Sequence, residues 1–133
     1  MFGAIGIAGS GVVTDQTWLD TIGGNLANMN DAVTPGRPVY QVESVLAAPS
    51  PPAAGEVAGG VHVEEIALSG RNGQLEYQPD DPLANAQGLV EYPAVDLAQE
   101  MVSLVMAQTS YQADASVMSH ADSAYQAILA MKG

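Results

Sequence analysis

Residues 93–131 read PAVDLAQEMVSLVMAQTSYQADASVMSHADSAYQAILAM, with no Gly or Pro after the first residue. A seven-residue grid collects mostly apolar residues in two registers, Leu97, Leu104, Tyr111, Met118 and Tyr125 in the first and Met101, Gln108, Ala115, Asp122 and Leu129 in the second. Residues three and four positions apart share one face of a helix, so this spacing predicts a single amphipathic helix. At 1.5 Å per residue it would be about 57 Å long.

Two interpretations of so long a helix are open. It could be the core helix of one globular domain, or it could bury its faces against other chains. Helices in globular proteins average about 11–12 residues, and a chain of 133 residues has little else with which to cover this one. We therefore favour a helix that packs against neighbouring molecules.

The composition is strongly acidic, with fifteen Asp and Glu against three Lys and Arg and a net charge of −12. Such a chain cannot neutralise phosphates, which argues against nucleic acid and against an anionic membrane surface as partners. There is no cysteine, which excludes disulfides and thiolate sites. The apolar first residues have no basic segment before them and are closed early by Asp15, so we expect neither a cleaved signal peptide nor a transmembrane span.

The charges are concentrated in the middle of the chain. Residues 31–93 hold nine acids and two arginines, whereas residues 1–30 hold only two acids and residues 94–133 hold four acids and one lysine. Terminal segments with so little charge are typical of helices that are surrounded on most sides. The acidic middle is expected to be the solvated part.

A second helical pattern occupies the N-terminal segment. One register holds Ile5, Val12, Leu19 and Leu26, and another holds Ala8, Asp15, Ile22 and Met29. The same segment contains six glycines, each of which costs a helix about 0.8–1 kcal/mol relative to alanine. The segment could form a helix only when packed against partners, or it could be a surface-docked helix that breaks at Gly23-Gly24.

Between the helices the sequence predicts a small β-rich insertion. Its first turn is centred on Pro35-Gly36, and residues 47–60 form a Pro-, Ala- and Gly-rich loop. The alternation of apolar residues shifts in the middle of residues 61–68, which indicates a β-bulge. Short strands are expected at residues 39–46, 61–68, 74–78 and 89–92.

The residue patterns give catalysis little support. His62 and His120 have no partner at metal-ligand spacing, and there is no nucleophile motif or phosphate-binding glycine loop. The acid pairs Glu64-Glu65 and Asp80-Asp81 are best interpreted as solvated charges. We expect no cofactor, no metal and no small-molecule substrate, and an enzyme is the least supported class.

Two clusters of residues resemble the flagellar axial proteins, the family of rod, hook and hook-associated proteins. The first is Asn25-Leu26-Ala27-Asn28 followed by Pro35-Gly36, which resembles the signature at the end of that family's first helix. The second precedes and enters the last helix and resembles a protein of the proximal rod; its members are Pro93, Asp96, Glu100, Met101, Tyr111, Gln112 and Ala113. The chain departs from the family at Ala94 and Asp114, where asparagine is usual.

The resemblance implies a structural subunit that passes through the flagellar type III export apparatus without a cleaved signal peptide. It would polymerise in the periplasmic space into the hollow drive shaft of the basal body and transmit torque around a central export channel. The implied partners are other copies of the chain, the rod proteins FlgB, FlgF and FlgG, the rod-base adaptor FliE and the MS ring region.

The expected fold class is α+β, with the terminal helices paired in a coiled-coil-like inner domain. The expected domains are residues 1–34 and 94–133 for the inner tube and residues 35–93 for the β-rich outer part. The residues expected at subunit interfaces are Ile5, Val12, Leu19, Ile22, Leu26, Leu97, Met101, Leu104, Tyr111, Met118, Tyr125 and Leu129. The alternative function is a stand-alone acidic helical protein-binding module.

Overall fold

The computed structural model describes residues 2–51 and 59–131. Its elements in chain order are α1 (Phe2–Asn28), β1 (Glu43–Pro49), β2 (Val61–Leu68), β3 (Gln74–Tyr77), β4 (Leu89–Tyr92) and α2 (Leu97–Met131). Two long helices at the ends of the chain therefore flank two small antiparallel sheets, β1–β2 and β3–β4. The expected α+β class with paired terminal helices is confirmed.

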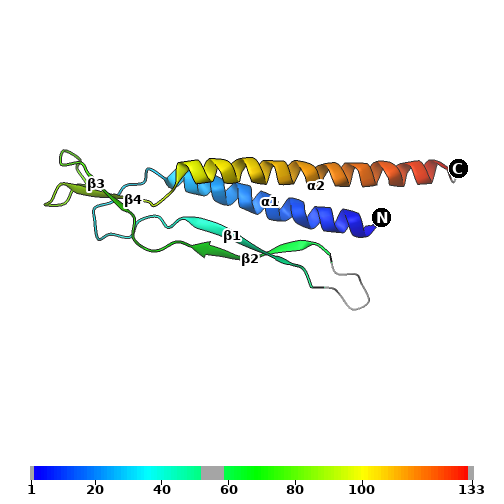
Figure 1. Ribbon diagram of the computed structural model, residues 1–133, viewed down its shortest axis with the longest axis horizontal. Helices are drawn as coiled ribbons and strands as arrows, with labels where there is room; N and C mark the ends of the chain where they lie inside the picture. The colour runs from blue at the N-terminus through cyan, green and yellow to red at the C-terminus, as the bar shows by residue number, and fades with distance from the viewer. Residues whose placement is uncertain (1, 52–58, 132–133) are drawn as a thin grey trace.

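The molecule is elongated, and α1 lies at its centre (Figure 1). One side of α1 packs against α2, which runs antiparallel to it, and another side packs against the β1–β2 hairpin. The β3–β4 hairpin lies beyond the end of the helix pair, at the opposite end of the molecule from both ends of the chain (Figure 1). We call the β3–β4 hairpin and its connections, residues 69–92, the tip.

Helix α1 runs without interruption through Gly23 and Gly24. The break considered at this glycine pair is therefore absent. Contact with α2 on one side and with β1–β2 on the other buries residues along the whole helix, which offsets the low helix propensity of its glycines. The helix ends at Asn28, whose side-chain Nδ2 donates a hydrogen bond of 2.8 Å to the carbonyl oxygen of Gly24.

Helix α2 begins at Leu97, four residues later than Pro93, where the sequence suggested its start. The Oδ1 atom of Asp96 accepts a 3.1 Å hydrogen bond from the backbone N–H of Gln99, so Asp96 is the N-cap. Pro93 is buried in the short connection from β4. The helix has 35 residues and is about 52 Å long.

The β1–β2 hairpin contains the bulge that the sequence indicated. Leu46 pairs with Glu65 and Ala47 pairs with Val63, which leaves Glu64 as the extra residue. The bounds expected for β2 and β4 are confirmed, and β3 is one residue shorter than expected.

The first strand was misplaced by the sequence analysis. It spans Glu43–Pro49 and not residues 39–46, and its last residues pair with the start of β2. Part of the stretch 47–60 that was expected to be a loop is therefore strand, and residues 52–58 of that loop lie outside the described residues. Cross-strand pairing prevails over the low strand propensity of Ala and Pro at this end of β1.

Besides Pro93, few apolar side chains of the described chain are buried, namely Ala8, Ile22, Val39, Val90 and Ala107. The largest fully buried side chains among the described residues are those of Ile22, Val90 and the polar Asn25. Helix α2 therefore contributes a narrow strip to the fold, and most of its residues are exposed.

Candidate assembly surface

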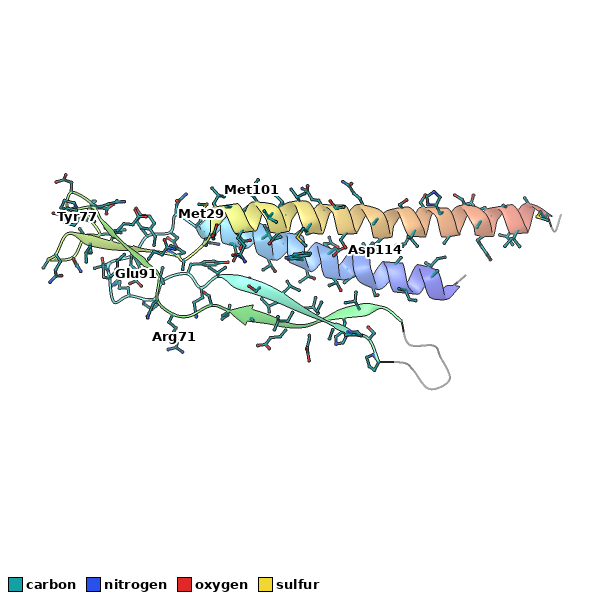
Figure 2. The ribbon with its side chains drawn as sticks, viewed as in Figure 1. Met29, Arg71, Tyr77, Glu91, Met101 and Asp114 are labelled. Atoms are coloured by element: carbon teal, nitrogen blue, oxygen red, sulfur yellow. The ribbon has the colours of Figure 1, made fainter. Side chains whose placement is uncertain are left out.

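The packing between the two helices is closest where α1 carries a glycine. Ala107, the one buried residue among those described in α2, is 0 % exposed. A Cβ atom added to Gly11 would collide with the carboxylate of Asp114, so glycine is needed at this crossing as long as that carboxylate keeps its place. Figure 2 shows Asp114 on the side of α2 that faces α1.

The seam between α1 and α2 differs by one residue from the one expected. Of the first register, Leu104 and Met118 are half-buried, whereas Leu97, Tyr111 and Tyr125 are exposed. The covered companion positions lie three residues after the first register and not four. Within the chain, the covered positions of that companion register are Glu100, Ala107, Asp114 and Ala121. The residues of the expected second register, among them Met101 and Leu129, are mostly exposed and remain available to other molecules.

The side chain of Asn25 joins three separate segments. Its Nδ2 donates to the carbonyl oxygen of Glu43 at 2.9 Å and to Oε1 of Glu100 at 3.1 Å. Its Oδ1 accepts from the hydroxyl of Tyr40 at 3.0 Å and from the backbone N–H of Glu43 at 2.9 Å. All four hydrogen-bonding positions of this amide are thus occupied, and α1, α2 and the start of β1 are locked together.

Two carboxylates lie beside the phenol of this junction. Burial, and then the negative charges of Glu43 and Glu100, raise the pKa of Tyr40 above its ordinary value. Tyr40 therefore stays protonated and continues to donate its hydrogen bond to Asn25.

A second junction attaches the tip to the helix pair. Val33 and Glu91 exchange backbone hydrogen bonds of 2.8 and 2.9 Å. The Glu91 carboxylate also accepts from the backbone N–H of Gly73 at 2.8 Å and of Gly36 at 3.3 Å. Gly36 has a φ of +89°, a conformation that favours glycine, which gives the Pro35-Gly36 motif its structural reason.

The outer face of α2 carries a row of exposed apolar residues near the start of the helix. Val102 and Val105 are 61 % and 60 % exposed, and Figure 2 shows Met101 at the surface away from α1. We call this row the apolar patch; its members are Leu97, Met101, Val102, Val105 and Met106. Monomeric proteins rarely leave such residues contiguous and uncovered, so the row is typical of a binding surface.

The far end of α2 is exposed along its length. Every residue from 122 to 131 is exposed, and Figure 1 shows this end of α2 extending past the start of α1. Tyr125, Ile128 and Leu129 lie there with large apolar areas in solvent. This overhang is a second surface that the chain itself does not cover.

The remaining residues expected at interfaces lie mainly at the edges of the seam. Ile22 is buried, and Ile5, Val12, Leu19 and Leu26 are half-buried at other positions along α1; Tyr111 is exposed on α2. Among the motif residues, the structure brings Asn25 and Glu100 into direct contact, whereas Ala27, Gln112 and Ala113 are exposed. The sequence marked Asn25 and Glu100 as motif members without showing that they meet.

Among the described residues, no three His, Cys, Asp or Glu side chains are gathered as a metal ion would require. No helix among them is apolar enough over a sufficient length to cross a membrane. His62 is exposed on β2, and His120 is exposed on α2 with its Nδ1 3.4 Å from the Ser116 hydroxyl.

The comparisons with known proteins agree on one family. A family model described as flagellar basal body rod FlgEFG protein C-terminal matches residues 86–131. The chain is 36 % identical over 116 residues to the flagellar basal-body rod protein FlgC of Escherichia coli O6:H1, covering 84 % of this chain and 83 % of the relative. It is 27 % identical over 147 residues to FlgC of Borreliella burgdorferi, covering 98 % and 97 %, and 29 % identical over 132 residues to FlgC of Bacillus subtilis, covering 88 % of each.

Proposed function

The chain belongs to the FlgC family of flagellar basal-body rod proteins, and from this membership we propose that α1 and α2 are the elements through which it polymerises in the rod. It is a structural subunit of the flagellar basal body, a role that requires contacts with other rod components. The proposal concerns which surfaces make those contacts and how they carry load.

The observation that carries the proposal is the apolar patch together with the overhang of α2. An isolated chain leaves both in water, whereas neighbouring helices would bury them at about 1.5–3 kcal/mol for each Leu- or Met-sized side chain. Subunits that associate through unlike surfaces form an open helical assembly when the rotation between neighbours does not close into a ring, and a rod requires this case. In this arrangement the helix pairs form the wall around a central export channel and transmit torque along the shaft.

The position of the helices in this proposed arrangement assigns each part of the chain to a part of the rod. We assign residues 1–34 and 94–133 to the inner tube and residues 35–93 to the outer part of the proximal rod. The partners we propose are other copies of the chain, FlgB, FlgF, FlgG, the adaptor FliE and the MS ring region. We further propose delivery by the type III export apparatus to the periplasmic space without a cleaved signal peptide.

The proposal is tested by placing a charge in the apolar patch. Val105→Asp alters a side chain that is 60 % exposed, so the fold of the subunit should be retained. We expect this variant to be exported normally and to fail to enter the rod, because a buried unpaired carboxylate opposes subunit packing. The measurement is the amount of the protein in purified basal bodies together with swimming motility.

Ser119→Asp, which adds the same charge at an exposed polar position of α2, is the control and should be incorporated. Normal rods built from Val105→Asp subunits would contradict the assignment of the patch. Loss of export with intact incorporation of the remainder would contradict the assembly role itself.

A further inference from the structure

A pocket between α1, α2 and the β1–β2 hairpin holds two carboxylates on largely apolar walls. Its volume is about 390 Å³, and its lining includes Asp15 and Asp114 together with Trp18, Val45, Val61 and Ser110. We call it the acidic pocket. Asp15 is 6 % exposed, and its Oδ2 atom is buried without a hydrogen-bond partner in the described chain.

The arrangement is unfavourable for a chain on its own. A carboxylate removed from water needs a hydrogen-bond donor or a cation, and no donor within the described residues reaches Oδ2 of Asp15. Asp114 brings a second negative group into the same pocket, where its carboxylate lies against Gly11. Two acids lining one pocket call for a positive group from outside.

The walls of the pocket indicate which kind of cation fits. Val45, Val61 and the indole of Trp18 are surfaces for a hydrocarbon stem and for a cation over an aromatic face. A divalent metal ion would need more oxygen ligands, and among the described residues no group of three acidic or histidine side chains is available. An arginine side chain, which combines a long stem with a planar cation, matches both the walls and the carboxylates.

The chain also carries arginines that lack a carboxylate of their own. Arg37 and Arg71 are exposed and line a second hollow, of about 500 Å³, beside Glu91. Both carboxylate oxygens of Glu91 accept from backbone N–H groups, and within the described residues neither arginine has an ion pair. Figure 2 shows Arg71 projecting away from the body of the molecule.

We propose that the acidic pocket receives an arginine side chain, from Arg37 or Arg71, of a second copy of this chain. The proposal rests on the assembly role above and adds a polar, direction-setting contact to the apolar ones. The acidic pocket lies between the helices and the arginines lie toward the tip, so the contact joins unlike surfaces. A head-to-tail contact of this kind can be repeated from one subunit to the next, which an open helical assembly requires.

The absence of cysteine makes a proximity test clean. Ser110 lines the acidic pocket, and Asn72 follows Arg71 in the arginine hollow. In cells that assemble basal bodies, full-length chains carrying Ser110→Cys and Asn72→Cys should be joined into dimers by a short bifunctional thiol reagent. Each single-cysteine chain alone should give none of this product.

Removing one charge at a time shows whether the yield of the cross-linked product depends on the carboxylates of the acidic pocket. We expect Asp15→Asn, which keeps the shape of the side chain, to reduce the cross-linked product by at least about tenfold, since truncating one partner of a desolvated charge pair is costly. Asp20→Asn, an exposed acid of the same helix, is the matched control and should leave the yield unchanged. Asp114→Asn gives an independent reading should Asp15→Asn impair folding.

Replacing the arginine that enters the acidic pocket, Arg37 or Arg71, with Gln should produce the same loss, whereas replacing the other one should leave the product, and the double replacement should abolish it. Two results would overturn this inference and leave the assembly role intact. One is a cross-linked product that persists when both arginines are replaced, and the other is no product from chains that enter the basal body normally. A chain that is never found in the basal body would overturn the assembly role instead. If sodium or calcium ions alone restored the cross-linked product in the arginine variants, the acidic pocket would be an ion site and not an arginine pocket.

Discussion

At the residue scale, the side chain of Asn25 has the largest structural role in the described chain. It is 1 % exposed, and its partners lie 18 residues away at Glu43 and 75 residues away at Glu100. Sequence patterns act over a few residues and could mark Asn25 only as a motif member. The hydrogen bonds of Asn25 could not be predicted from such patterns, because they join residues that are far apart in the sequence.

Replacing Asn25 with Ala should destabilise the chain by about 3 kcal/mol, because buried partners lose their hydrogen bonds. The expected result is a lower midpoint in urea unfolding followed by circular dichroism. Asn30→Ala, at an exposed position after α1, is the control and should change the midpoint little. A midpoint for Asn25→Ala equal to that of the control would show that the junction does not hold the three segments together.

The Tyr40 phenol makes a pH-dependent contribution to the same junction. Its pKa in the folded chain lies above the ordinary value of 10.0, so the unfolded chain loses this proton first. The stabilisation is therefore complete below about pH 10 and is lost as the pH rises through the raised pKa. Ultraviolet titration of tyrosinate should show a late component that Tyr40→Phe removes; a titration unchanged by that substitution would contradict the shift.

At the scale of elements, the sequence was most informative where a helix or strand is continuous. Both helices, the bulge and the bounds of β2 and β4 follow from periodicity alone. The start of α2 and the position of β1 do not, because a capping carboxylate and cross-strand pairing set them. The seam was displaced because Glu100 and Asp114 are polar, and a grid that seeks apolar residues passes over them.

The glycines of α1 should divide into two classes on substitution. Nothing lies within 4 Å of a Cβ added to Gly6, so Gly6→Ala should stabilise the helix by about 1 kcal/mol. Gly11→Ala gains the same propensity but displaces the carboxylate of Asp114, so it should be less stable than Gly6→Ala. Thermal unfolding measures both.

A double-mutant cycle shows whether the Asp114 carboxylate causes the lower stability of Gly11→Ala. When Asp114→Ala has already removed the carboxylate, Gly11→Ala should become stabilising. If Gly11→Ala stays unfavourable in that background, backbone proximity and not the carboxylate is what requires glycine there.

At the scale of the whole molecule, the fold has a thin core and a long helix α2 whose residues are mostly exposed. The first and last helices form a strip in which small residues and a few polar junctions fix the geometry, while larger apolar residues face outward. The sequence indicated such an excess of apolar helix surface. It could not divide that surface between contacts within the chain and contacts with neighbours, because a heptad pattern does not mark which face meets the chain's own helix and which meets another molecule.

Hydrogen exchange should reveal this division directly. In the dilute subunit we expect the amides of residues 122–131 to exchange much faster than those of residues 100–114, since the residues of the first group are all exposed. Incorporation into the rod should slow hydrogen exchange mainly in residues 122–131. Equal protection of both groups before assembly would mean that the overhang is stable without neighbours.

The overhang of α2 has a mechanical consequence. Figure 1 shows that the two helices end at different heights, so subunits stacked end to end as proposed would overlap and would not meet at a flat face. In that assembly a twisting load would pass through overlapping stretches of helix, with no flat plane along which neighbouring layers could slip.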